Sequence, residues 1–439
     1  MIIGPAEPGK FYGWKTLAAV AVMYFAMTGL LLYSFPAILP FLCNSFGWSR
    51  ASVSWANSLA MVVTGIVSPF AGMYVMRYGA RKAVAVGGIL CILCFVCASA
   101  HTQLWQLYLA YAVLFGLGGA LCGMLTMTSI VNNWFVKKRS LALSILLAAG
   151  GLGGLVMVPF LVSMINRFGW RITYLLVAVM IFVLLVILPS LLVVNKPEDL
   201  GQVPDGTPAD DKKDYSPNKQ NLYGTPVDFT AGEAIRTSSF WYLTILVTAF
   251  VFGIQGFMLH QVAFLIDIKI SSTVASLVYG SFVGVSTAGR LMMGFLGIRY
   301  PTKPIAIIAM LLLISGLVIL LWAKTLPIII LYNALIGLGM GGTYVAIMNL
   351  IPLYFGKTHY PKIIGFALPF STIIGSIGSP LTGWIRDVSG SYKSAWELAI
   401  LILAIGLVAL VLARPPVHPS MRENRAGSIV GVNSSSSMN

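Results

Sequence analysis

Stretches of about 20 apolar residues recur along nearly the whole chain, and each is long enough to cross the hydrocarbon core of a bilayer as a helix. Charged residues make up only 9% of the 439 residues, whereas a soluble domain carries about 25%. The pattern predicts an all-α integral membrane protein with twelve transmembrane helices, near 15–39, 52–75, 83–101, 105–134, 140–165, 172–194, 239–265, 272–296, 304–323, 326–354, 362–385 and 395–413.

The formal net charge of +15 is explained by membrane topology and does not indicate a nucleic-acid partner. If both termini lie in the cytoplasm, 20 Lys and Arg residues fall in cytoplasmic segments and 7 in external segments, with Arg290 inside a span. This asymmetry is the positive-inside pattern. We therefore predict a multi-pass protein of the cell membrane, plasma or inner, with both termini cytoplasmic. We expect a monomer whose surroundings are the lipid bilayer.

A polar segment over 196–237 divides the spans six and six. The halves resemble each other, because FGLGGALCG (115–123) in span four matches IGLGMGGTY (336–344) in span ten. Such a repeat predicts two pseudo-symmetric six-helix bundles with a binding site between them at mid-membrane. Thr230 and Glu233 have capping-box spacing, which indicates a short helix before span seven. The predicted domains are an N-terminal bundle over 1–195, a cytoplasmic linker over 196–237, a C-terminal bundle over 238–414 and a disordered cytoplasmic tail over 415–439.

Glycines cluster in the fifth span, at Gly150, Gly151, Gly153 and Gly154. Small residues let neighbouring membrane helices approach closely. The cluster therefore predicts either tight packing alone or a contact that moves.

Arg290 is the strongest pointer to function, because no other formal charge lies between Val274 and Leu296. An arginine at the centre of a membrane helix costs about 2.5–3.5 kcal/mol on insertion scales, and it cannot lose its proton. Its guanidinium must contact protein, water or an anion. The functional interpretation is a charge-assisted bond to a substrate carboxylate. The alternative is snorkelling toward the cytoplasm or capping of backbone carbonyls.

Five further residues are candidates for the substrate site. Tyr33 and Tyr344 can bond a carboxylate and shield Arg290 from water, although most membrane tyrosines only pack or anchor. Ser286 and Thr287 lie one turn before Arg290 on its face of the helix and can bond the guanidinium or the substrate. His260 can carry a proton at mildly acidic pH, or it can be a neutral helix contact.

Other chemistries find little support in the sequence. Asp and Glu do not occur in the predicted span cores, so proton coupling would use His260 or travel with the substrate. The CxxCxxC of Cys91, Cys94 and Cys97 has no His or acid nearby and is interpreted as helix packing rather than a metal site. The sequence has no phosphate-binding loop for ATP. We expect no enzymatic activity, no cofactor and no metal.

The loop between spans two and three, GMYVMRYGARK (72–82), resembles the G-x-x-x-D-R-x-G-R-K loop of the major facilitator superfamily. The matching residues, which the resemblance assigns to a conformational loop, are Gly72, Arg77, Gly79, Arg81 and Lys82. Position 76 is Met, where the superfamily has an aspartate.

Within the superfamily, the chain is most similar to the monocarboxylate transporters and the oxalate/formate antiporters. The resemblance rests on the order and spacing of FYGW (11–14), FGWSRASVSW (46–55), NWFVKKRSLALSILLAAGGLGG (133–154), KPEDLGQVPDG (196–206) and EAIRTSSFWYL (233–243). In these families an arginine in span eight binds the substrate carboxylate, and Arg290 matches it.

Three differences from these families narrow the expected substrate. Ala37 stands where mammalian-type carriers have a lysine after Phe-Pro, and Ser286 stands where they have an aspartate. The antiporter's second cation in span eleven has no counterpart, because no Lys or Arg occurs over 363–385. One fixed cation suits one carboxylate, so we expect a secondary transporter of a small organic anion, most simply a monocarboxylate, with a coupled proton or a counter-anion. The alternatives are a dicarboxylate antiporter, an exporter of unrelated compounds and a sensor that does not transport.

Overall fold

The computed structural model describes residues 11–135, 138–206, 228–356 and 359–418. These residues form helices joined by turns and extended segments, with no strand among them. Half of the predicted linker (207–227) and most of the predicted disordered tail (419–439) lie outside the described residues.

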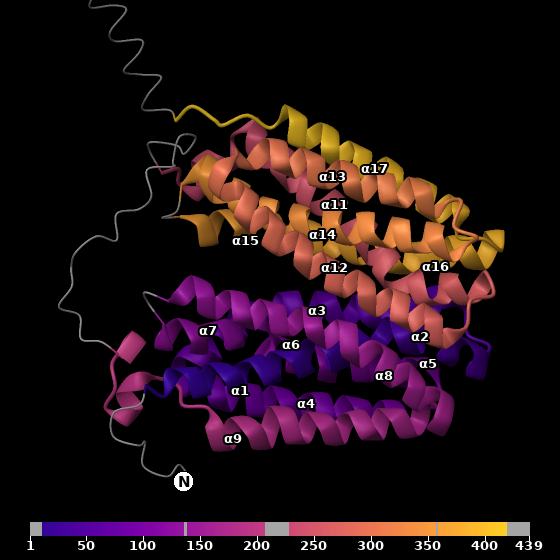
Figure 1. Ribbon diagram of the computed structural model, residues 1–439, viewed down its shortest axis with the longest axis horizontal. Helices are drawn as coiled ribbons and strands as arrows, with labels where there is room; N and C mark the ends of the chain where they lie inside the picture. The colour runs from indigo at the N-terminus through magenta and orange to yellow at the C-terminus, as the bar shows by residue number, and fades with distance from the viewer. Residues whose placement is uncertain (1–10, 136–137, 207–227, 357–358, 419–439) are drawn as a thin grey trace, which may run out of the picture.

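The first half of the chain forms one bundle, drawn from indigo to magenta in Figure 1. Its elements are α1 (Gly13–Ala26), η1 (Met27–Leu32), α2 (Ser34–Phe46), α3 (Arg50–Tyr78), α4 (Ala80–Ala100), α5 (Leu104–Leu109), η2 (Ala110–Phe115), α6 (Gly116–Cys122), α7 (Met124–Trp134), α8 (Arg139–Ile181), η3 (Phe182–Ile187) and α9 (Leu188–Leu192). The short turns η4 (Pro197–Leu200) and η5 (Pro204–Gly206) follow it.

The second half forms the other bundle, drawn from pink to yellow. Its elements are α10 (Ala231–Ile235), α11 (Ser238–Asp267), α12 (Ser272–Arg299), α13 (Thr302–Leu320), α14 (Leu326–Phe355), α15 (Tyr360–Ser376), α16 (Gly378–Ser389) and α17 (Lys393–Leu412). The predicted short helix before span seven is confirmed as α10, where Thr230 and Glu233 form the reciprocal capping box.

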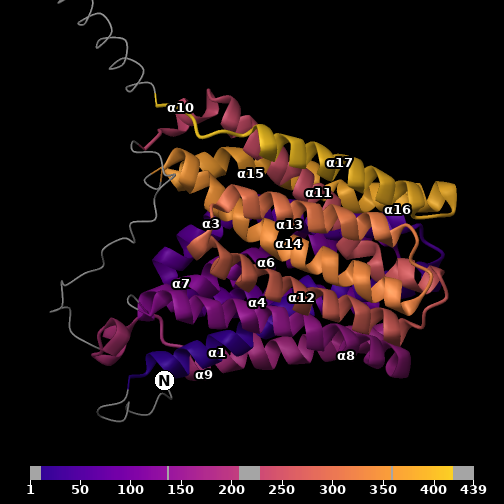
Figure 2. The ribbon, with the colours of Figure 1, turned by 45° about the horizontal axis from the view of Figure 1, so that its top comes forward.

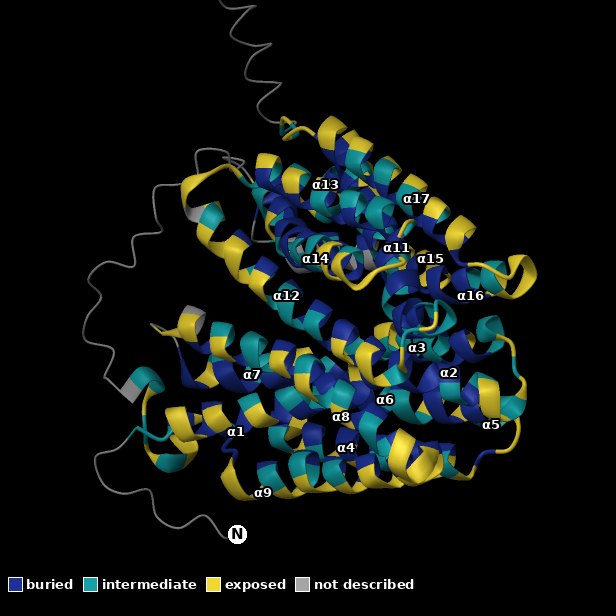
Figure 3. Ribbon diagram, turned by 45° about the vertical axis from the view of Figure 1, so that its right-hand side comes forward, coloured by how far each residue is buried: buried dark blue, intermediate teal, exposed yellow. Residues whose placement is uncertain are grey.

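The twelve predicted spans agree with these helices. Nine stretches of the described chain are long and apolar enough to cross a membrane, and one of them, 141–192, contains both spans five and six. Gly169 separates these two spans with φ of +79°, a left-handed conformation that glycine adopts without steric cost. Helix α12 and the pair α15 and α16 supply the remaining two spans. Large apolar side chains lie exposed on the outer faces of the bundles (Figure 3); Ile308 and Leu401, for example, are 57% and 59% exposed. This exposure is expected where lipid covers the protein.

Polar side chains join the two halves at one end of the molecule. Nη1 and Nη2 of Arg50 on α3 donate to the carboxylate of Asp267 on α11 at 2.9 and 2.6 Å. Nε of Arg386 donates to the same carboxylate at 2.8 Å. We call this group the Arg50 seam, and it comprises Arg50, Ser54, Ser58, His260, Asp267, Ser376, Ser379, Arg386, Asp387 and Tyr392.

The halves also meet along α8 and α12, which lie side by side in both views of the ribbon (Figures 1 and 2). This contact begins near the Arg50 end, where Asn166 Nδ2 donates to Ser272 Oγ at 3.2 Å. It continues past Gly280, where an added Cβ would lie 2.7 Å from the carbonyl oxygen of Leu155, and reaches Gly151 beside Thr287. The opposite end of the molecule carries the described residues 196–206 and is called the linker end.

Candidate functional site

Arg290 lies on α12 immediately after the part of that helix that contacts α8. Its guanidinium carbon sits 5.2 Å from the centre of the Tyr344 ring of α14, which is within the range of a cation–π interaction. The Arg290 Nε atom is buried and has no hydrogen-bond partner within the described structure. A buried donor without a partner costs stability, so this nitrogen is available to a ligand.

Glycines on α14 bring the Tyr344 ring to Arg290. A Cβ on Gly341 would lie 2.0 Å from the carbonyl oxygen of Ser286 and 2.8 Å from the amide nitrogen of Arg290. On α12, a Cβ on Gly289 would lie 2.5 Å from the carbonyl oxygen of Leu338. The span-ten glycine motif therefore permits a backbone contact that no larger residue allows.

The glycine cluster of α8 has the same effect on the first half. Added Cβ atoms would lie 1.8 Å from Thr287 Oγ1 at Gly151 and 2.4 Å from the Tyr24 ring at Gly150. Gly154 touches both Tyr33 of the first half and Val283 of α12. Helix α8 thus packs at once against α1 and against α12 of the other half.

Tyr24 of the first half and Tyr344 of the second lie near Arg290. The hydroxyl of Tyr24 on α1 lies within electrostatic range of Tyr33, Tyr344 and Arg290. Tyr33 ends the π-helical turn η1, and its ring packs edge-on against Tyr279 of α12 with centroids 6.4 Å apart. The Tyr279 hydroxyl is buried without a partner in the described structure. Tyr24 was not among the predicted residues, because only the packing of α1 against Gly150 of α8 brings it near Arg290. Tyr279 contacts Tyr33 about three helical turns before Arg290 and belongs to the contact between the halves.

The two hydroxyls predicted beside Arg290 differ in their bonding. Ser286 Oγ is buried and has no partner among the described residues. Thr287 Oγ1 instead donates to the carbonyl of Val283 at 3.1 Å and contacts Gly151. Neither hydroxyl bonds the guanidinium, so Ser286 is free to bond a ligand and Thr287 belongs to the contact between the halves.

The structure places His260 in the Arg50 seam. Its Nε2 lies 2.9 Å from the carbonyl oxygen of Ser379 and 3.1 Å from Ser54 Oγ, and its Nδ1 lies 3.1 Å from the Tyr392 hydroxyl. A carbonyl only accepts, so Nε2 carries the proton and Nδ1 accepts from Tyr392. Burial raises the pKa of the Tyr392 phenol, which keeps that donor protonated. The His260 imidazole is thus held by the contact between the halves. It makes no hydrogen bond to Arg290 in the described structure.

The predicted conformational loop connects α3 to α4 within the first half. Gly79 has φ of +87°, and Arg81 N donates to Asn195 Oδ1 at 2.9 Å while its side chain bonds the Ser190 carbonyl. Met76 is 81% exposed. Gly79 and Arg81 therefore fasten this loop to the end of span six.

The remaining predicted loop residues make fewer contacts. Arg77 stacks its guanidinium 5.3 Å from the Tyr78 ring, Lys82 is exposed, and a Cβ on Gly72 would meet only Leu125, at 3.7 Å. The cysteines of the CxxCxxC are free thiols. The described residues contain no cluster of His, Cys, Asp or Glu able to hold a metal ion.

Comparison with known proteins now places the chain in a family. The profile of the Major Facilitator Superfamily matches residues 17–266 and 242–433, so the chain belongs to this superfamily of membrane transporters. The predicted fold is confirmed, and the chain is a multi-pass membrane transporter rather than an enzyme.

Curated relatives support the resemblance within the superfamily. Monocarboxylate transporter 13 of Bos taurus is 26% identical over 407 residues, covering 92% of this chain and 90% of the relative. Monocarboxylate transporter 11 of Homo sapiens is 26% identical over 433 residues, covering 94% and 84%. The Agnestins efflux protein AgnL12 of Paecilomyces divaricatus is 23% identical over 371 residues, covering 83% and 78%.

A solved structure shares the fold. The bacterial homolog of the human lysosomal transporter Spinster, in an inward-facing and occupied conformation, has a TM-score of 0.70 and 15% identity. The match covers 92% of this chain and 97% of that structure. At this identity the likeness concerns the fold alone.

Proposed function

We propose that this transporter moves a small organic monocarboxylate across the membrane by alternating access, with Arg290 as the group that binds the carboxylate. The observation that carries the proposal is the unpartnered, buried Nε of Arg290 beside the equally unpartnered Ser286 hydroxyl. A carboxylate accepts from both donors and neutralises the charge that the membrane helix holds. The names of the monocarboxylate relatives support the same substrate class.

The single positive charge of Arg290 fits a monocarboxylate better than a dicarboxylate. Between Asp267 and Asp387 the chain has no Asp or Glu, and over 363–385 it has no Lys or Arg. Arg290 therefore faces the substrate without an acidic neighbour on α12, α13, α14 or α15 and without a second cation over 363–385. The tyrosine rings favour the apolar part of the anion.

The seam suggests which side the site opens to. The positive-inside pattern puts the linker end in the cytoplasm and the Arg50 seam outside. The seam then closes the external side, and Arg290 lies just beyond the last described contact of α8 with α12, at Gly151 and Thr287. This arrangement supports a state that receives its substrate from the cytoplasm.

Transport then follows from the two contacts between the halves. Anion binding neutralises Arg290, which lets the halves close over it at the linker end. Opening the external side requires the Asp267 carboxylate to release Arg50, while the glycine-lined contact of α8 with α12 acts as the pivot. The membrane spans offer no acidic proton carrier near Arg290, so exchange of one anion for another, or a proton that travels with the substrate, is the simplest coupling.

The test is flux in proteoliposomes that contain the purified protein. Short monocarboxylates and dicarboxylates are screened with wild type, Arg290→Ala and the control Lys324→Ala, whose side chain is exposed at the turn between α13 and α14. We expect saturable uptake of a monocarboxylate by wild type and the control, and its loss in Arg290→Ala. Equal uptake by Arg290→Ala and wild type would refute the role of Arg290.

Efflux of a larger organic compound is a second candidate, because one relative is named an efflux protein. Vesicles loaded with short carboxylates and with larger aromatic acids separate the two functions. Release of the larger acids alone, unaffected by short carboxylates, would favour efflux.

A further inference from the structure

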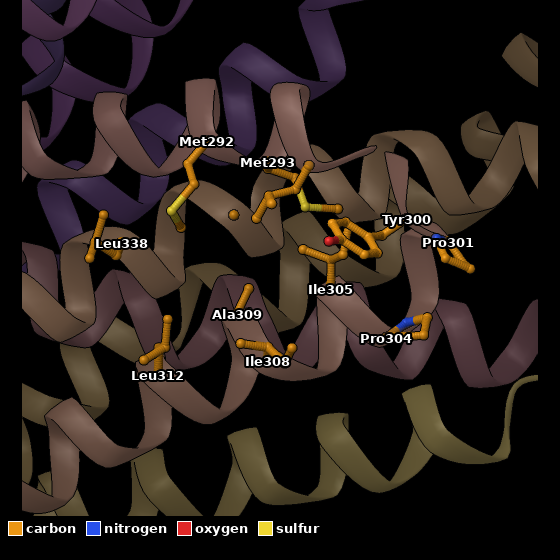
Figure 4. Close-up of a pocket in the computed structure, with 12 residues that line it drawn as sticks. Met292, Met293, Tyr300, Pro301, Pro304, Ile305, Ile308, Ala309, Leu312 and Leu338 are labelled. Atoms are coloured by element: carbon orange, nitrogen blue, oxygen red, sulfur yellow. The ribbon is translucent and has the colours of Figure 1, made fainter. Parts of the chain in front are cut away.

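An apolar groove of about 280 Å³ lies between α12 and α13, over α14. Figure 4 shows its lining, which includes Met292, Met293, Tyr300, Ile305, Ile308 and Leu312. Ile308 and Tyr300 are 57% and 58% exposed, so the groove opens on the surface of the bundle. Both helices cross the membrane, and the exposed side chains of their outer faces meet hydrocarbon. The ligand that reaches such a groove is a lipid chain.

Apolar lining alone does not select a lipid, because burying an apolar group in a membrane gains little over leaving it in lipid. Selection requires polar groups at the mouth of the groove. Arg299 directly precedes Tyr300 and is exposed, and Lys303 stands between the lining residues Pro301 and Pro304. The groove therefore has a cationic end.

The positive charge at this end has no acidic neighbour on the helices that form the groove, since the sequence from 268 to 386 contains no Asp or Glu. Lys303 Nζ donates to the carbonyls of Val411 and Ala413 at 2.8 and 2.6 Å, which fixes it beside the end of α17. Arg414 lies within electrostatic range of Lys303. The exposed Arg299, which follows the groove on α12, and Lys303, which lies between two lining residues in the sequence, match a lipid with an anionic headgroup.

We propose that this groove binds an anionic phospholipid of the leaflet at the linker end, with one acyl chain between α12 and α13 and the phosphate at Arg299 and Lys303. The chain would pack on Met293, one turn beyond Arg290 on the same helix. The bound lipid thus supports the helix that carries the arginine. This inference does not depend on which substrate the protein transports.

The test uses the wild-type protein in nanodiscs that contain a phosphatidylglycerol with a photoreactive group on its acyl chain. After illumination, mass spectrometry locates the labelled peptides. We expect labelling within 292–312 that unlabelled phosphatidylglycerol competes away and that a phosphatidylcholine probe does not reproduce. Equal labelling by both probes, or labelling spread evenly over exposed helices, would overturn the proposal.

Matched variants test the two parts of the site separately. Ile308→Trp fills the groove, whereas Leu311→Trp places the same bulk on another exposed position of α13. Arg299→Gln removes a cation at the mouth, and Lys393→Gln removes an exposed one at the opposite end. We expect Ile308→Trp to abolish the labelling and Arg299→Gln to lower probe affinity about fivefold, with both controls like wild type. Unchanged labelling in Ile308→Trp and Arg299→Gln would contradict the lipid site. Because labelling is read without transport, failure of the lipid site is distinguishable from failure of the proposed substrate.

Discussion

At the scale of single residues, the account depends on polar atoms that the protein itself does not satisfy. Buried polar groups in native proteins are nearly all hydrogen-bonded, and exceptions call for an explanation. Arg290 Nε and Ser286 Oγ are two such exceptions on adjacent turns of α12. A carboxylate bound between them explains both at once.

Ser286→Ala should raise the KM for the transported anion about fivefold and leave kcat nearly unchanged, because it removes one hydrogen bond to the bound substrate, worth about 1 kcal/mol. Stability should not fall, since the hydroxyl has no partner to lose. The control is Ser276→Ala, a buried serine of the same helix that donates to the Thr273 carbonyl at 2.7 Å. Flux kinetics in proteoliposomes measure both variants, and an unchanged KM in Ser286→Ala would remove Ser286 from the site.

The Tyr344 ring should matter more than its hydroxyl. Tyr344→Phe keeps the ring under the guanidinium and should retain substrate affinity within about threefold, whereas Tyr344→Leu loses a cation–π interaction of about 0.5–2 kcal/mol. Competition for uptake by unlabelled substrate gives the affinities. Equal losses in both variants would show that the hydroxyl, rather than the ring, is what the site uses.

At the scale of helices, glycine decides which spans can meet. The sequence was sufficient to predict the fold and its spans, because apolar runs are local signals. That Arg290 and Tyr344 bind the substrate stays a prediction; the structure shows that their side chains lie together. The sequence could not show that Tyr24 lies within electrostatic range of Arg290, since the two residues are far apart in the chain. Nor could it show that His260 bonds Ser379 and Tyr392, which are distant in sequence. The predicted role of His260 in substrate binding stays a prediction.

Gly341→Ala should abolish transport and lower the melting temperature, because the new Cβ would lie 2.0 Å from the backbone carbonyl oxygen of Ser286. Backbone cannot move aside as a side chain does, so α14 must shift away from Arg290. Gly297→Ala on α12, where a Cβ meets nothing within 4 Å, serves as the control. Thermal unfolding in detergent and flux are measured together, and a fully active Gly341→Ala would contradict the close contact of α12 with α14.

At the scale of the whole molecule, the Arg50 seam and the α8–α12 contact are two of the contacts between the halves. The seam concentrates charge-assisted bonds at one end, whereas glycines dominate the α8–α12 contact, with Thr287 and the Asn166–Ser272 hydrogen bond as its polar members. The seam was not foreseen from the sequence, because Arg50, Asp267 and Arg386 each stand alone at the end of a span. Only the fold shows that the three ends converge.

Asp267→Asn should shift the protein toward a state that is open at the Arg50 end. The carboxylate accepts from Arg50 and Arg386, and both side chains lose a charged partner in the variant. Spin labels at exposed positions Trp105 and Val388, one in each half, report the separation by pulsed electron resonance.

The matched control for the seam is Glu397→Gln, whose carboxylate pairs within its own half with Lys393 at 4.0 Å. We expect longer distances in Asp267→Asn and an unchanged distribution in the control. The same distribution in wild type and Asp267→Asn would mean that the seam does not hold the halves together.

Equilibrium binding of the transported carboxylate and of its neutral amide to wild type, Arg290→Lys, Arg290→Ala and Lys324→Ala decides whether Arg290 binds the substrate carboxylate. We expect wild type and Lys324→Ala to bind the carboxylate and to reject the amide. Arg290→Lys should bind the carboxylate weakly, since it keeps the charge without the planar fork, and Arg290→Ala should not bind it. Binding of the carboxylate by Arg290→Ala with wild-type affinity, or equal binding of acid and amide by wild type, would contradict the account.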